Sequence, residues 1–185
     1  MNKKVLVACE CSQVVCTAFR LVGDIAYSCD IEPCYGGHPE WHIKCDVAQV
    51  INDDWDIVIA HPPCTFLTKA SAYLWRNGQH KLCEIWAARN FFMMFTQLKC
   101  PTCIENPIPL KFINLPKPTQ WICPSQFGHK YTKKTGLWLY DLPPLLPMRA
   151  APVITQQWMR HAAGNSKARS RFFEYVAEAM AIQWG

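Results

Sequence analysis

Apolar segments that alternate in length predict an α/β fold for this chain, in which a mostly parallel sheet is flanked by helices. Two observations carry this prediction. Short apolar runs of strand length alternate with longer segments whose apolar residues recur at helical spacing. The first run, at 4–9, is almost continuously apolar, as in a parallel strand that is covered on both faces. Right-handed crossovers between such strands would place the helices against the sheet.

Four strands and one clear helix are expected in the first 60 residues. Ser12 can cap the helix and Gly23 can end it, and the apolar residues between them recur at helical spacing. A loop with Gly and Pro, at 32–40, and a brief helix, at 47–52, join later strands. The expected strands are 4–9, 25–29, 42–46 and 56–60.

The rest of the chain contains the longest expected helix, at 80–99, which has no Gly or Pro and places most of its large apolar residues on one side. A fifth strand at 100–107 precedes an irregular, Pro-rich insertion at 107–135. A strand at 135–140 and a last helix at 167–184 complete the order. With no internal repeat, these elements predict one domain over 1–185.

The composition is that of a packed globular protein, because 50% of the 185 residues are hydrophobic and 18% are charged. No apolar run approaches the roughly 20 residues of a membrane-spanning helix. The start of the chain, 1–12, has a basic beginning and an apolar run, but the run reaches Glu10 too soon for a secretion signal. We therefore expect a first strand and a cytoplasmic protein without a membrane partner.

The 11 cysteines are odd in number and show no framework spacing, so reduced thiols that mostly fill the core are expected. Cys100 and Cys103 have metal-ligand spacing, but a zinc site needs a second such pair and the sequence has none. No metal is therefore predicted.

Charge is distributed unevenly along the chain. Residues 1–110 contain 9 Lys and Arg against 11 Asp and Glu, whereas residues 111–185 contain 10 against 3. A basic C-terminal part suits a polyanionic partner, either nucleic acid or a nucleotide phosphate, and suits a merely solvated basic face equally well. Its basic residues include Lys130, Lys133, Lys134, Arg149, Arg160, Lys167, Arg169 and Arg171.

Polar residues follow every expected strand, and parallel sheets bind ligands beyond the carboxyl ends of their strands. An acid after the second strand is where a ribose hydroxyl is commonly bound, and one after the third strand could accept from an adenine amino group. These strand ends are Glu10, Asp30, Asp46, His61-Pro62-Pro63-Cys64 and Glu105-Asn106.

The fourth strand ends abruptly, because Pro62 and Pro63 carry no backbone N–H for a strand ladder. They form a stiff turn with Cys64 at its tip. A nucleophile and a structural thiol are both open interpretations of Cys64 at this point.

Together these motifs resemble the S-adenosylmethionine-dependent DNA cytosine-C5 methyltransferases. "PPC" resembles the family's Pro-Cys nucleophile motif and "ENP" its Glu-Asn-Val motif, while "ECS" sits where the family has its cofactor loop. Two acids match its second and third cofactor acids, and "GNS" with the last helix resembles its closing Gly-Asn motif. The positions are 62–64, 105–107, 10–12, Asp30, Asp46 and 164–166. The patterns "AHPPCT", "IENP" and "FGH…K.T.LWL" look more closely like short phage- and prophage-encoded methyltransferase-like proteins.

The resemblance implies a Rossmann-like fold of the class I methyltransferase type and methyl transfer from S-adenosylmethionine to cytosine C5. Cys64 would add covalently to C6, and Glu105 would hold the N3 edge. Pro63, Asn106, Lys133 and Lys134 would contact the substrate, which is DNA or a deoxynucleotide. The implied cofactor contacts are Glu10, Cys11, Ser12, Asp30, Asp46, Pro62 and Asn165.

The chain departs from the family at three points. Gln13, Val15 and Cys16 stand where the family has glycines, so side chains are expected to narrow the cofactor pocket. The family's arginine motif is not clear, and Lys133 and Lys134 are its nearest candidates.

The third departure is the recognition domain. Only residues 141–163 lie between the strand at 135–140 and "GNS", too few for a domain that reads bases in duplex DNA. Four arrangements would make a recognition domain unnecessary: a single-stranded substrate, low sequence specificity, a partner subunit or a free nucleotide. Tryptophans such as Trp121, Trp138 and Trp158 could stack on bases, fill the core or bury a homodimer contact.

Two other functions remain open. A non-catalytic relative could keep the fold to bind nucleic acid, a nucleotide or a host protein. "HPPC" could also be a variant of the Asp/Asn-Pro-Pro-aromatic motif of amino-methyltransferases, but His61 and Cys64 fit that motif poorly. We rank the amino-methyltransferase third.

Overall fold

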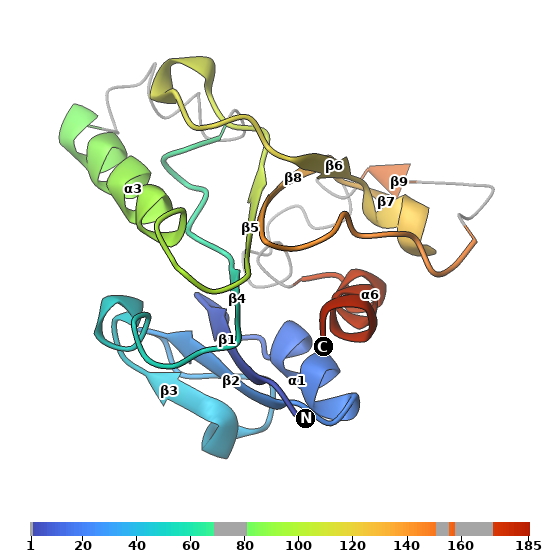
Figure 1. Cartoon of the computed structure of the whole chain (residues 1–185). Coiled ribbons are helices and arrows are strands. Elements are labelled where there is room, and N and C mark those ends of the chain that lie inside the picture. Colours follow the sequence, from blue (N-terminus) through green and yellow to red (C-terminus); the bar gives the residue numbers. More distant parts are fainter. Residues whose placement is uncertain (1, 69–80, 151–155, 158–171) are drawn as a thin grey trace.

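The centre of the molecule is a seven-stranded sheet with the strand order β3-β2-β1-β4-β5-β8-β6 (Figure 1). The structure is a computed structural model, and it describes residues 2–68, 81–150, 156–157 and 172–185. The strands of this sheet are β1 (Lys4–Ala8), β2 (Ile25–Asp30), β3 (His42–Lys44), β4 (Ile57–Ala60), β5 (Thr102–Pro107), β6 (Gln120–Ile122) and β8 (Thr135–Tyr140).

Five of these strands are parallel. β1 pairs in parallel with both β2 and β4, β2 with β3, and β4 with β5. β8 runs antiparallel between β5 and β6. The prediction of a mostly parallel, Rossmann-like α/β sheet is confirmed. Because the chain runs outward from β1 in one direction and from β4 in the other, the strand order reverses between these two strands, which is where open α/β sheets form a crevice.

Within the described ranges, three helices flank the sheet, with α1 (Val14–Leu21) and α6 (Glu174–Trp184) on one face and α3 (Leu82–Phe95) on the other (Figure 1). Alternation along β1 divides the core between the two faces. Val5 and Val7 belong to the cluster with α1 and α6, and Leu6 and Ala8 to the cluster with α3. This two-sided burial explains why the strand runs read as continuously apolar.

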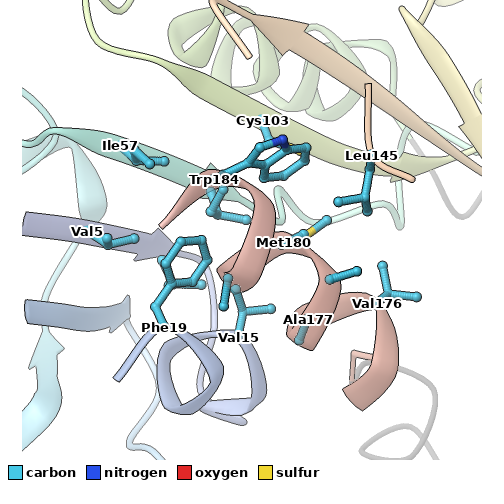
Figure 2. Close-up of a cluster of buried hydrophobic side chains, with 14 of the residues drawn as sticks. Val5, Val15, Phe19, Ile57, Cys103, Leu145, Val176, Ala177, Met180 and Trp184 are labelled. Carbon is cyan, nitrogen blue, oxygen red and sulfur yellow. The ribbon is translucent and has the colours of Figure 1, made fainter. Parts of the chain in front are cut away.

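The core under α6 is formed by residues that are far apart in sequence. Figure 2 shows Val15 and Phe19 of α1 gathered with Ala177 and Met180 of α6 beside the strands. Phe19, Ala177 and Met180 are fully buried. At about 25 cal/mol per Å² of apolar surface, each large side chain in such a core contributes on the order of 2 kcal/mol relative to exposure.

Helix boundaries differ from the sequence expectation. Ser12 does not cap α1: the N-cap residue is Gln13, whose side chain makes no cap hydrogen bond. The helix expected at 80–99 ends at Phe95, and residue 80 lies outside the described residues. The last helix begins at Glu174, after the non-helical residues 172–173, and residues 167–171 lie outside the described part.

Two strands, β3 and β5, are also shorter than expected. β3 ends at Lys44, so Asp46 lies beyond it, and β5 begins at Thr102. The segment expected to be a helix at 47–52 forms one 3₁₀ turn, η2 (Val47–Gln49). A further 3₁₀ turn, η1 (Pro39–Trp41), lies in the loop before β3.

The Pro-rich stretch at 107–135 is more ordered than expected. It contains β6, the 3₁₀ helices η4 (Lys111–Ile113) and η5 (Pro124–Phe127), and β7 (Tyr131–Thr132). β7 pairs with β9 (Gln156–Gln157) in a small two-stranded sheet. Strands of two or three residues are too short to show a period in sequence, so tertiary pairing alone reveals them. No helix among the described residues has the length and apolar character to cross a membrane.

Candidate functional site

The carboxyl ends of β1, β4 and β5 bring three titratable side chains together at the strand-order reversal. Ala8 of β1 is in register with Ala60 of β4, which is in register with Ile104 of β5. The His61 amide continues this register by donating to the Ala8 carbonyl over 2.9 Å. Glu10, His61 and Glu105 therefore lie at neighbouring positions along one edge of the sheet.

His61 and Glu105 form the central contact of the site. His61 Nδ1 lies 3.3 Å from Glu105 Oε2, and the two side chains are only 12% and 10% exposed. An ionised carboxylate only accepts hydrogen bonds, so Nδ1 carries the proton of this contact. The Phe172 ring covers the imidazole, with ring centroids 4.8 Å apart. His61 Nε2 is buried and has no hydrogen-bond partner among the described residues.

Glu10 caps α1 in place of Ser12. Its carboxylate accepts from the backbone amides of Val15 (2.8 Å) and Cys16 (3.1 Å), and Ser12 Oγ donates to it over 3.2 Å. A negative charge at a helix N-terminus is favourable because the free amides point at it. Burial nevertheless raises the pKa of Glu10, and the charge of His61 and these hydrogen bonds offset that rise only in part.

The pKa of Glu105 shifts in the opposite direction, to below its usual value. Burial alone would raise its pKa, but the His61 hydrogen bond, the Lys133 charge and a hydrogen bond with Thr135 together hold the pKa below the usual value. Two carboxyl groups of one site thus have pKa values that move apart, a pattern that is typical of acid–base chemistry.

Cys64 is half-buried on the turn that follows β4. Burial, and then the Glu105 charge, raise the pKa of its thiol, and Lys133 opposes the rise. The turn after Cys64 is closed on its carbonyl, which accepts from the Leu67 amide (3.0 Å) and from the amide and hydroxyl of Thr68 (3.2 Å each). The thiol is therefore carried on a fixed turn but is protonated at neutral pH.

Asn106 holds the proline turn to β5. Its Nδ2 donates to the Pro62 carbonyl over 2.9 Å, and the side chain is fully buried. A second hydrogen bond joins the end of this turn to the segment after β5: the Leu110 amide donates to the Leu67 carbonyl over 2.8 Å. Asn106, predicted to contact substrate, is thus placed where it positions Pro62. Pro62 is buried, whereas Pro63 is exposed.

The two lysines predicted to contact substrate point to different places. Lys133 is half-buried, and its charge lowers the pKa values of both Cys64 and Glu105. Lys134 is exposed, and its Nζ lies 4.8 Å from the centroid of the Trp121 ring. The Lys133 charge therefore acts on Cys64 and Glu105, whereas the Lys134 ammonium lies over the Trp121 ring.

The loop at Glu10–Cys16 follows a path that normally needs glycine. Cys9 and Gln13 adopt φ values of 60° and 59°, in the left-handed region. Gln13 is held there by its own side chain, which donates to the His38 carbonyl (2.7 Å) and accepts from the His38 amide (3.0 Å). Gly36 lies so close that a Cβ there would be 2.5 Å from the Ser12 carbonyl oxygen.

The side chains expected to narrow a cofactor pocket are turned inward. Val15 and Cys16 are fully buried in the core between the sheet and α6, and Gln13 is 1% exposed. These non-glycine side chains are accommodated in the interior of the protein. The narrowing of a cofactor pocket by them stays a prediction.

The acids after β2 and β3 lie at the same edge. Asp30 is half-buried and accepts from the Glu32 amide over 3.0 Å, while Asp46 is exposed and accepts from the Ala48 amide over 3.0 Å. Burial raises the pKa of Cys9, and the charges of both acids add to that rise. The charges of both carboxylates therefore act on the Cys9 thiol.

Cys11, which was predicted to contact the cofactor, is also in this region. Its pKa is raised, by burial first and then by Asp30, while a Tyr35 hydrogen bond opposes the rise.

Two of the tryptophans with predicted stacking or core roles differ in exposure. Trp138 is buried and donates to the Pro116 carbonyl over 2.8 Å, whereas Trp121 is 39% exposed. The following residues with predicted roles lie outside the described residues: Trp158, Arg160, Asn165, Lys167, Arg169 and Arg171.

Comparison with known proteins leaves the site to be interpreted from its own chemistry. No protein-family model matches the chain, and no curated protein matches it. Within the described residues, no group of three or more His, Cys, Asp or Glu side chains is placed to hold a metal ion.

His61 and Thr135 contact Glu105 but were not assigned a role from the sequence. A signal for His61 existed, since it directly follows a buried strand and precedes the two prolines. Its position near both Glu10 and Glu105 could not be predicted from a local pattern, because these acids are 51 residues before it and 44 residues after it in the chain.

Proposed function

We propose that this chain is an S-adenosylmethionine-dependent methyltransferase that acts at C5 of cytosine, in DNA or in a deoxynucleotide, through a covalent adduct at Cys64. The observation that carries the proposal is that Asn106 ties the turn of Cys64 to β5, the strand that holds Glu105, and that the Glu105 charge acts on the thiol. A thiol and a carboxyl at neighbouring strand ends suit addition to a pyrimidine ring.

The chemistry requires both groups. C5 of cytosine is a weak nucleophile until a thiolate adds to C6 and makes C5 enamine-like. Glu105 would hold N3 and stabilise the protonated adduct, and Lys133 would favour the thiolate of Cys64. When bound, the cofactor supplies an electrophilic methyl group that C5 can attack. A fixed turn supports this step, because positioning is a large share of such a barrier.

The residues along the edge fit this cofactor. Asp30 and Asp46 offer carboxylates that can accept from ribose hydroxyls and from an amino group. The left-handed backbone at Cys9 and Gln13 lets the loop between β1 and α1 follow a glycine-type path, and Gln13 is turned inward. Glu10 would act on this loop by holding the start of α1.

Incubation with tritiated methyl donor tests the proposal. Single-stranded DNA, duplex DNA and dCMP should be compared, and we expect label in at least one of them. Cys64→Ala should abolish transfer, while Cys83→Ser, which changes an exposed thiol on α3, should leave it unchanged. No transfer to any substrate, or full transfer by Cys64→Ala, would contradict the proposal.

A non-catalytic nucleic-acid-binding protein of the same fold is the second candidate. It is favoured by the exposed Lys134–Trp121 pair and by Lys130, whose Nζ lies 5.4 Å from the Tyr131 ring centroid. Such pairs suit a phosphate and a stacked base. Calorimetry separates the two functions: the binding protein should bind single-stranded DNA and give no heat with S-adenosylmethionine.

A further inference from the structure

His61 is the buried group that links the two carboxyls of the site. It contacts Glu105 through Nδ1, and its charge lowers the pKa of Glu10 on the other side. The groups that face it come from several elements: Glu10 after β1, Glu105 in β5, and the apolar ring of Phe172 before α6. Lys133, which precedes β8, also lowers the pKa of Glu105 through its charge.

The proposed chemistry needs a proton at this point. When sulfur adds to C6 of cytosine, the π electrons move towards N3, and N3 must take up a proton for the adduct to be stable. Glu105 is the group at that edge, but its surroundings favour the carboxylate, which has no proton to donate. A second group must therefore supply the proton to Glu105.

His61 suits this task better than Lys133. Its Nδ1 is 3.3 Å from the Glu105 carboxylate, and an imidazolium ordinarily gives up its proton far more readily than an ammonium group. The contact is shielded from water, since both side chains are about nine-tenths buried. A proton can thus pass between the two groups without exchange into bulk solvent.

We propose that His61 is a positioning residue that holds, against Glu105, the proton that passes to N3 as Cys64 adds to C6. Once the Cys64 thiol has lost its proton to water, the S–C6 bond forms and the C5–C6 π bond shifts its electrons towards N3. N3 takes the proton from Glu105, and Glu105 takes one from the imidazolium, which becomes neutral imidazole. When the thiolate leaves, the proton returns along the same path. This role rests on the proposed function.

Tritium release from C5 tests the role without any methyl donor. Single-stranded DNA labelled with tritium at cytosine C5 loses the label when Cys64 adds and N3 is protonated, because C5 then exchanges its hydrogen. For the unaltered protein we expect the rate to rise with pH while the thiolate fraction of Cys64 grows. Above the pH at which that growth ends we expect a falling limb, because fewer molecules then hold the proton between His61 and Glu105. His61→Gln can still hydrogen-bond to Glu105 but cannot titrate, so we expect a loss of about 10²-fold and no falling limb.

The outcomes separate the two claims. If the unaltered protein releases tritium and His61→Gln keeps both its rate and its falling limb, the role of His61 is overturned while the proposed function stands. If the unaltered protein releases none from single-stranded DNA, duplex DNA or dCMP, the proposed function fails and the role of His61 with it. Circular dichroism of His61→Gln excludes misfolding as the cause of a lost rate.

NMR of the His61 ring gives a second test that needs no activity. Glu105→Gln replaces the charged acceptor next to Nδ1 with a neutral one, so the resonance of the Nδ1 proton should move upfield. Lys134→Ala, whose ammonium lies over the Trp121 ring, should leave that resonance where it is. An unchanged resonance in Glu105→Gln would show that the two groups share no proton and would overturn the role.

Discussion

The two edges of the sheet use the same kinds of charged residue in different ways. At the edge where the parallel strands begin, acids hold the backbone: the Lys3 amide donates to Asp24 over 2.9 Å, and the Lys4 amide donates to Asp56 over 2.7 Å. At the edge where they end, Glu10, Asp30 and Asp46 also accept from backbone amides. Glu105 differs, because it is held by other side chains, His61 and Lys133.

The difference shows which charges are free for chemistry. A hollow of about 330 Å³ lies at the first edge and is lined by Lys3, Asp56 and Trp184 among others. The Lys3 ammonium there already donates to the Trp184 carbonyl over 2.6 Å. Charges that hold backbone stabilise strand ends, whereas charges that hold one another can change their protonation state together. Substitutions at the two edges should therefore affect different properties.

Glu105→Gln should give the largest effect and the sharpest contrast. Methyl transfer should fall by about 10² to 10⁴-fold, because the amide cannot exchange a proton with N3. Asp56→Asn, at the opposite edge, should leave the rate unchanged and cost less than about 1 kcal/mol of stability, since its hydrogen bond is exposed. Rates with tritiated methyl donor and urea unfolding measure both. A rate loss in Asp56→Asn would remove the distinction between the edges.

Asn106→Ala should lower both stability and activity. It removes the buried hydrogen bond to the Pro62 carbonyl and leaves that carbonyl unpaired, at a cost of about 1–3 kcal/mol. The turn that carries Cys64 should loosen, so the rate should fall as well. Urea unfolding and transfer rates check this, with Asn52→Ala, on the exposed turn before β4, as the control. Unaltered stability in Asn106→Ala would contradict the tie between the turn and β5.

Acid should destabilise the protein partly through Glu105. Its pKa is lower in the folded state than in the unfolded chain, so the unfolded state binds the extra proton in the window between them. The stability that Glu105 contributes is present above its ordinary pKa of about 4.3 and is lost as pH falls through the folded value. Urea unfolding from pH 6 to pH 3 should show a smaller loss for Glu105→Gln than for the unaltered protein, and an equal loss would contradict the shift.

Thiol alkylation should give the smallest effect. Burial and Glu105 raise the pKa of Cys64, so iodoacetamide should modify it more slowly than the exposed Cys83 at pH 7, and the rate at Cys64 should rise with pH. Lys133→Ala should slow Cys64 a further few-fold, because Lys133 favours the thiolate, while Lys134→Ala should not. Peptide mass spectrometry follows each thiol. Equal effects of the two lysine variants would contradict their separate placement.

Several residues of the candidate site could be predicted from the strand ends visible in the sequence. The acids Asp30 and Asp46 and the turn around Cys64 follow strands whose apolar runs are visible in the sequence, and parallel pairing brings such ends to one edge. The expectation that Ser12 caps α1 was wrong, because Glu10 reaches the same free amides and is better placed to do so.

The sequence by itself determined the alternation of strands and helices and the residues that follow each strand, since period and proline act locally along the chain. The tertiary structure alone decided which of those residues meet. His61 contacts Glu105 across 44 residues, Gln13 binds His38 across 25, and β6 exists by pairing with β8. Such contacts depend on packing between distant segments, and no local pattern records them.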